Sequence, residues 1–93
     1  MMIASFRSKA LQRFFETGDS RKLSVSNVPR LSRILRALDD ADRPEHMNLP
    51  GLRFHGLKGD QKGRFAVDAS GNRRVTFGWS VEGAVEVDLE DYH

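Results

Sequence analysis

The chain has 93 residues, of which 39% are hydrophobic and 30% charged, with a formal net charge of +2; these values fit a single globular domain, residues 1–93. The sequence contains no cysteine, which excludes disulfide bridges, zinc–thiolate sites and cysteine nucleophiles. It also has no apolar run approaching the roughly 20 residues that cross a bilayer, and no apolar signal-peptide core. We therefore expect a cytoplasmic protein that does not enter the membrane.

The N-terminal half predicts two helices. Residues 3–6 form either a short strand or the lead-in to the first helix, which is expected over residues 9–17. Ser8 is suited to cap the start of that helix and Gly18 to end it. Asn27 is the expected cap of the second helix, which carries apolar residues at helical spacing on one side. The members of this stripe are Val28, Leu31, Ile34, Leu35 and Leu38.

The C-terminal half predicts strands. Residues 43–51 contain two prolines and a glycine and should form a loop. Alternating apolar residues then indicate strands, and glycine-containing turns separate the later ones. The expected strands cover residues 52–55, 65–67, 74–79 and 85–89. Two helices followed by about four strands predict an α+β domain, with the helices packed on one face of an antiparallel sheet.

Basic residues are spread along the chain, and two groups of them bear on function. On the second helix, Arg30, Arg33 and Arg36 lie opposite the apolar stripe. They form either a solvated face or an RNA contact, and we favour the solvated face because the side opposite a core must be polar. The second group lies in residues 58–74, which contain five basic and only two acidic residues. Local positive charge of this kind favours a polyanion such as RNA, although it also occurs on ordinary solvated surfaces.

A set of side chains in the C-terminal half fits the cleavage of RNA without a metal. In this reaction a base removes the proton of the ribose 2′-hydroxyl, a cation stabilises the phosphate, and an acid protonates the leaving 5′-oxygen. Histidine suits both proton transfers, lysine and arginine suit the cation role, and an aromatic ring can stack on an unpaired base. The residues that supply these parts are His55, Lys58, Arg74, Asp91, Tyr92 and His93.

Simpler interpretations of these residues exist. His55 fits an ordinary strand residue bound to a backbone carbonyl, and Tyr92 fits an anchor at the sheet edge. His55, Asp91 and His93 would also suit a divalent metal, but no short metal-ligand spacing supports this. We therefore expect neither a metal nor another cofactor.

At these residues the chain resembles a known family, the HigB toxins of the RelE/ParE superfamily. The resemblance extends over essentially the whole chain and suggests that Met2 is the natural start. Its most specific parts are the histidine–glycine–leucine–lysine–glycine segment at residues 55–59 and a terminal triplet at a fixed separation. The segments that carry it are MIASF at residues 2–6, LRFHGLKGD at 52–60, NRRVTF at 72–77 and DYH at 91–93.

This resemblance implies a function and partners. Members of the family have the compact RelE-like fold and are ribosome-dependent endoribonucleases that cleave mRNA in the ribosomal A site, arresting translation and growth. A HigA-type antitoxin with a helix-turn-helix domain neutralises them, and operator DNA is contacted only through that antitoxin.

The resemblance also assigns residues. His55, Asp91, Tyr92 and His93 match the family's catalytic positions, and Lys58 and Arg74 match positions that bind phosphate. The family usually has tryptophan or another large residue before the strand arginine; here it is Arg73, which adds a cation expected to contact RNA. Which group acts as the base stays open.

Two alternatives use the same fold. One is a ParE-like toxin that inhibits DNA gyrase without cutting RNA; the other is a catalytically weak toxin that acts mainly as a partner for its antitoxin. A gyrase inhibitor has no need of a terminal proton-transfer group, so residues 91–93 favour the nuclease.

Overall fold

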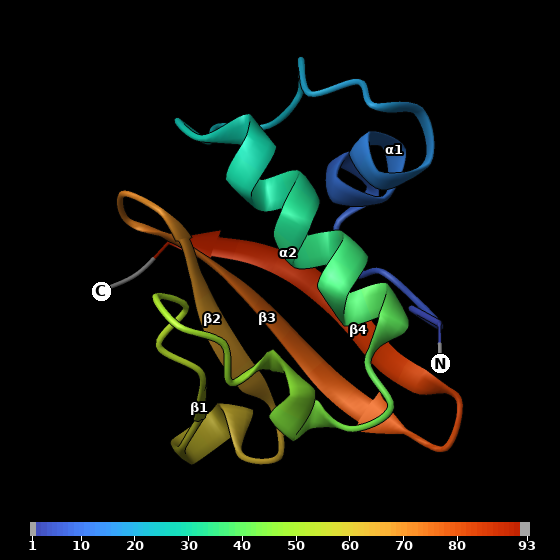
Figure 1. Ribbon diagram of the computed structural model, residues 1–93, viewed down its shortest axis with the longest axis vertical. Helices are drawn as coiled ribbons and strands as arrows, with labels where there is room; N and C mark the ends of the chain where they lie inside the picture. Colours follow the sequence, from blue (N-terminus) through green and yellow to red (C-terminus); the bar gives the residue numbers. More distant parts are fainter. Residues whose placement is uncertain (1, 92–93) are drawn as a thin grey trace.

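The structure, a computed structural model, describes residues 2–91 of the chain. In this part, the longer helix crosses one face of an antiparallel sheet and the first helix lies to its side, beyond the last strand, which confirms the predicted α+β class (Figure 1). The α-helices are α1 (Lys9–Thr17) and α2 (Val28–Asp40), and the strands are β1 (His55–Gly56), β2 (Phe65–Ser70), β3 (Arg73–Ser80) and β4 (Gly83–Asp91). Two short 3-10 helices are η1 (Pro44–Met47) and η2 (Gly59–Gln61).

Both predicted helices are present with the predicted caps. The Ser8 hydroxyl accepts a hydrogen bond from the backbone N–H of Leu11, and Gly18 ends α1 in the left-handed conformation with φ 81°. The Asn27 side chain accepts from the backbone N–H of Arg30 at the start of α2. These caps satisfy backbone groups that a helix end leaves unpaired, so the helix bounds follow from local sequence.

The strands follow one another across the sheet in the order β1-β2-β3-β4. The last three strands are longer than the alternation alone predicts, because tight turns join them and the pairing continues to the turns. The N-terminal residues run beside β4: Ala4 N donates to Ala84 O at 2.7 Å, and Phe6 forms a single parallel bridge with Val87. The segment at residues 3–6 is thus an edge bridge that leads into α1.

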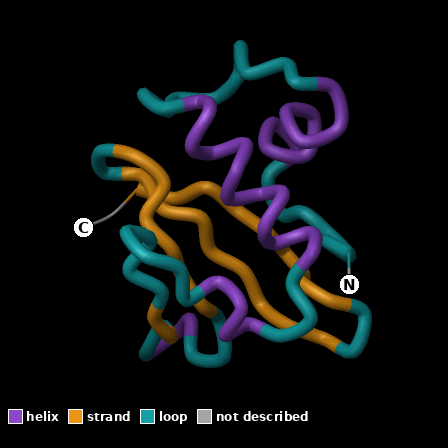
Figure 2. The backbone as a smooth tube through the Cα atoms, viewed as in Figure 1, coloured by secondary structure: helices purple, strands orange, loops and turns teal. Residues whose placement is uncertain are grey.

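Two local predictions are corrected. The strand expected at residues 52–55 is only the two-residue β1, because Arg53 has a φ of 54° and turns the backbone out of the extended conformation. Leu52 still accepts a hydrogen bond from the Asp68 N–H at 2.8 Å, so the segment stays beside β2. Residues 43–51, expected to be a loop throughout, contain the 3-10 helix η1 (Figure 2).

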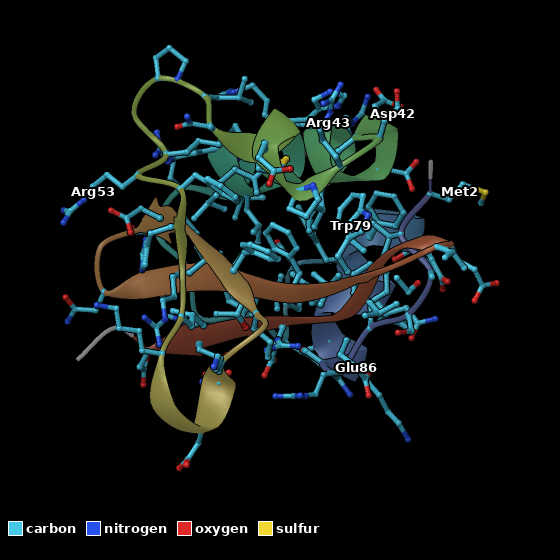
Figure 3. All side chains as sticks on the ribbon, turned by 90° about the horizontal axis from the view of Figure 1, so that it is seen from below. Met2, Asp42, Arg43, Arg53, Trp79 and Glu86 are labelled. Atoms are coloured by element: carbon cyan, nitrogen blue, oxygen red, sulfur yellow. The ribbon has the colours of Figure 1, made fainter. Side chains whose placement is uncertain are left out.

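The hydrophobic core lies between α2 and the sheet. The predicted stripe of α2 is buried from Leu31 to Leu38, while Val28 at its start is only partly buried. Trp79 lies on this same side of the sheet, beneath the helices (Figure 3). The sheet residues that pack against the helices include Val67, Val75, Phe77, Val87 and Leu89. This burial decides which face of the sheet remains for a functional site.

The β3–β4 turn meets the N-terminal segment at Gly83. This residue has a φ of 122°, and a Cβ there would lie 2.1 Å from the Met2 carbonyl oxygen. Gly83→Ala is therefore expected to lower the free energy of unfolding by about 2 kcal/mol or more, through backbone strain and this clash. Urea denaturation measures the loss. Gly56→Ala is the matched control, because a Cβ at Gly56 would have no heavy atom within 4 Å; an equal loss in both variants would contradict the prediction.

Candidate functional site

The sheet face turned away from α2, here called the helix-free face, carries mostly polar residues in two rows. Paired residues of antiparallel strands lie on the same face. The register therefore places one row across the sheet at His55, Ala66, Thr76 and Asp88, and a second row at Asp68, Arg74 and Glu90. Glu86 lies on this same side, opposite α2 and Trp79 (Figure 3). The helix-free face thus holds two predicted site residues, His55 and Arg74.

His55 is half-buried on β1 with one ring nitrogen engaged. Its Nδ1 lies 2.8 Å from the carbonyl oxygen of Arg53. A carbonyl oxygen can only accept a hydrogen bond, so Nδ1 carries the proton and the neutral ring keeps Nε2 as its proton acceptor. The left-handed backbone of Arg53 orients this carbonyl toward the ring. The residue that interrupts the predicted strand therefore also determines which ring nitrogen of His55 carries the proton.

Glu90 is the centre of a polar network on the helix-free face. Its Oε1 accepts a hydrogen bond from Gln61 Nε2 at 3.2 Å, and its Oε2 accepts from the hydroxyl of buried Thr76. Burial acts to raise the pKa of the Glu90 carboxyl. The hydrogen bonds from Thr76 and Gln61 and the charges of Arg74 and Arg64 outweigh it, so the pKa lies below its ordinary value of 4.5. The network therefore keeps Glu90 ionised.

This pKa shift has a consequence for stability. A carboxyl with a lower pKa in the folded than in the unfolded chain stabilises the fold above the unfolded pKa, and that contribution is lost as the pH falls through the folded pKa. The difference in unfolding free energy between the parent and Glu90→Gln should thus be largest near neutral pH and shrink as the pH falls below 4.5. Urea titrations at a series of pH values test this, with Glu82→Gln as the exposed control. A difference that did not change with pH would contradict it.

Arg64 crosses the helix-free face. Its Nη2 donates to Thr76 Oγ1 at 3.0 Å and to the backbone carbonyl of Glu86 at 2.9 Å. A Cβ at Gly78 would lie 3.9 Å from Arg64 Nη1, so the guanidinium passes over this glycine. Burial is the main cause that lowers the pKa of Arg64, and the charge of Arg7 acts in the same direction. Arg64, which directly precedes β2, therefore links the start of that strand to β3 and β4.

The neighbouring arginines of β3 lie on opposite faces. Arg74 pairs with Glu90 on the helix-free face, whereas Arg73 pairs with Asp91 in the row of the helix-covered face. Arg73 Nη1 donates to Asp91 Oδ1 at 2.6 Å. The structure therefore places Arg73 beside Asp91, while the contact with RNA that the sequence predicts for Arg73 stays a prediction.

The remaining predicted residues that the structure describes are Lys58 and Asp91. Lys58 is exposed at the start of η2. Asp91 ends β4, at the edge of the sheet opposite β1 and His55; three strand spacings separate these edges by about 14 Å. Tyr92 and His93 lie outside the described residues. The structure thus brings His55 and Arg74 to one face of the sheet, and places Asp91 next to Arg73 on the strand beside Arg74 but at the opposite edge from His55.

The network at Glu90 was not predicted from the sequence, although a signal for part of it exists. The alternation of Glu86, Asp88 and Glu90 with apolar residues indicates that these acids share a face. Continuing the pairing of the β3–β4 turn without a shift would place Arg74 opposite Leu89, and only the register shift between Thr76 and Gly78 places it opposite Glu90. Gln61 lies in a segment without periodic apolar spacing, so no sequence signal indicates its contact with Glu90.

Other predicted features have clear places. Arg33 and Arg36 are exposed, as expected for the solvated side of α2, whereas Arg30 Nη2 donates to the Gly51 carbonyl at 2.7 Å. Within residues 2–91 no group of three or more histidine or acidic side chains is arranged to hold a metal ion. In the same range, no helix combines the length and apolar character needed to span a bilayer.

Comparison of the sequence with known proteins identifies similar proteins of one family. Residues 4–93 match the model of the HigB-like toxins, described as RelE-like toxins of type II toxin–antitoxin systems. The chain is 34% identical over 92 residues to endoribonuclease HigB of Proteus vulgaris, covering 99% of this chain and 100% of that one. It is 31% identical over 80 residues to toxin HigB-1 of Vibrio cholerae, covering 84% of each chain.

Proposed function

The chain belongs to the HigB family of RelE-like toxins of type II toxin–antitoxin systems, and from this premise we propose that it is an endoribonuclease that cuts mRNA and arrests growth. The observation that carries the proposal is the full-length similarity to an endoribonuclease, combined with a histidine and an arginine on one face of the sheet. A toxin of this kind has a cognate antitoxin. We propose a HigA-type antitoxin with a helix-turn-helix domain, through which alone the toxin meets operator DNA.

The reaction that fits the site is attack of the ribose 2′-hydroxyl on the adjacent phosphorus, which needs no metal. His55 is suited to accept the hydroxyl proton through Nε2, because its Nδ1 is engaged by the Arg53 carbonyl. Arg74 and Lys58 stabilise the added charge on the phosphate oxygens. His93 then protonates the leaving 5′-oxygen, with Asp91 orienting it and Tyr92 stacking on or positioning a base.

We further propose that the ribosome presents the mRNA. The described part of the site is one sheet face that carries His55 at its edge and Arg74, with Lys58 in the adjoining loop. For attack, an RNA strand must be held so that the 2′-hydroxyl is in line with the phosphorus and the leaving oxygen. A ribosome fixes mRNA in the A site in an extended form, which would supply the alignment. This places the protein in the cytoplasm with its substrate.

The direct test maps cuts in mRNA on purified bacterial ribosomes. The parent protein is expected to cut mRNA in the A site, to leave naked RNA largely intact, and to lose about 10²- to 10⁴-fold in rate on His55→Ala, the usual contribution of a general base or acid. Efficient cutting of naked RNA would contradict ribosome dependence. Growth arrest with intact mRNA and inhibited DNA supercoiling would instead identify a gyrase inhibitor.

A further inference from the structure

The loop that carries Lys58 is tied to the last strand by one carboxylate. Gln61 ends the 3-10 helix η2, and its backbone N–H donates to the Lys58 carbonyl at 3.3 Å. Its carbonyl accepts from the Arg64 N–H at 3.0 Å, while its side chain reaches Glu90 Oε1 on β4. The hydrogen bonds therefore run without a break from Lys58 through Gln61 to Glu90.

The same carboxylate lies beside the second cation of the site. Glu90 pairs with Arg74 across β3 and β4 on the helix-free face, where directly opposed Cβ atoms lie about 5 Å apart. Its other oxygen is bound by the hydroxyl of Thr76, which also accepts from Arg64. Glu90 thus contacts the loop that carries Lys58 and pairs with the strand that carries Arg74. Each of its carboxylate oxygens accepts a hydrogen bond.

We propose that Glu90 is a positioning residue that holds the Lys58 loop and Arg74 in fixed relation over the helix-free face, an inference that rests on the nuclease function proposed above. Cations stabilise a transition state when they are already in place as the charge develops. A free carboxylate beside a phosphate would oppose RNA binding, but here one oxygen accepts a hydrogen bond from Thr76 and the other from Gln61. Glu90 therefore acts through the two cations and does not touch the RNA.

This role predicts that loss of the Glu90 carboxylate lowers the cleavage rate without weakening binding. In single-turnover cleavage of ribosome-bound mRNA, Glu90→Gln should lower the rate at saturating toxin by about tenfold or more, because displaced catalytic groups lose rate steeply. The toxin concentration for half-maximal rate should stay the same or fall, since a negative charge near the phosphate is removed. A variant that merely unfolded in part would raise that concentration instead.

Matched variants distinguish the effect of losing the hydrogen bonds to Glu90 from the effect of losing its charge. Thr76→Val removes the hydroxyl at constant shape and should slow cleavage in the same way, whereas Thr76→Ser keeps the hydroxyl and should retain the parent rate. Gln61→Ala breaks the link to the loop while leaving the Glu90 charge, so it should slow cleavage to a smaller extent. Glu82→Gln makes the same change of charge in the exposed β3–β4 turn and should leave the rate unchanged.

A second readout does not depend on cleavage. In the free protein, amide hydrogen exchange over residues 58–64 should be faster in Glu90→Gln and Gln61→Ala than in the parent, with exchange in α2 unchanged. Unchanged exchange in this loop, or a parent rate of cleavage in Glu90→Gln, would overturn the positioning role while leaving the nuclease function intact. A parent protein that cuts no mRNA would overturn the proposed function itself, whatever the loop does.

Discussion

Removal of Asp91, Tyr92 and His93 is expected to abolish growth arrest while leaving a folded protein that still binds its antitoxin. Among the described contacts of this segment is the pairing of Asp91 with Arg73, whose side chains are 59% and 25% exposed. An exposed ion pair contributes about 0–1 kcal/mol, so the core between α2 and the sheet should remain intact. Loss of the proposed acid, by contrast, removes about 10²- to 10⁴-fold in rate.

The measurement compares growth after induction of the parent, the truncated chain and His93→Ala, together with thermal unfolding of each. His93→Ala should reproduce the loss of toxicity with an unfolding temperature close to that of the parent. Asp91→Asn separates the contribution of the carboxylate from that of the imidazole. A truncated chain as toxic as the parent would rule out a terminal catalytic group and favour gyrase inhibition.

Arg74→Ala is the second change with a large expected effect. Removal of one preorganised donor to a developing negative charge lowers rates by about 10²- to 10³-fold, and Arg74 is the strand cation on the same face as His55. Arg73→Ala should have a smaller effect, because in the structure its guanidinium lies on the opposite face beside Asp91. Single-turnover cleavage of ribosome-bound mRNA measures both rates.

The comparison of these adjacent arginines needs a control for overall charge. Arg33→Ala removes one positive charge from the exposed side of α2 and should leave the cleavage rate unchanged. Arg74→Lys retains the charge but not the planar fork of donors, so it should recover only part of the rate. Equal losses in Arg73→Ala and Arg74→Ala would show that the two faces of β3 contribute alike, against the placement proposed for the phosphate.

The helices and most of the sheet were predictable because their signals are local. Ser8, Gly18 and Asn27 act on backbone groups within a few residues of themselves, and the apolar spacing of α2 encodes its buried side directly. The strand expected at residues 52–55 was wrong in length because the left-handed backbone of Arg53 leaves no trace in a pattern of apolar and polar residues. That same residue directs the carbonyl that engages His55.

By itself, the sequence determined the fold class, the family and the types of side chain available for RNA cleavage, since each depends on residue identity and short spacing. Tertiary structure alone decided which of these side chains share a face. Strand register separates Arg73 from Arg74 and joins Arg74 to Glu90, and a contact between residues 29 positions apart adds Gln61. Register and long-range contacts depend on how the whole chain buries its core, and no short stretch of sequence contains that information.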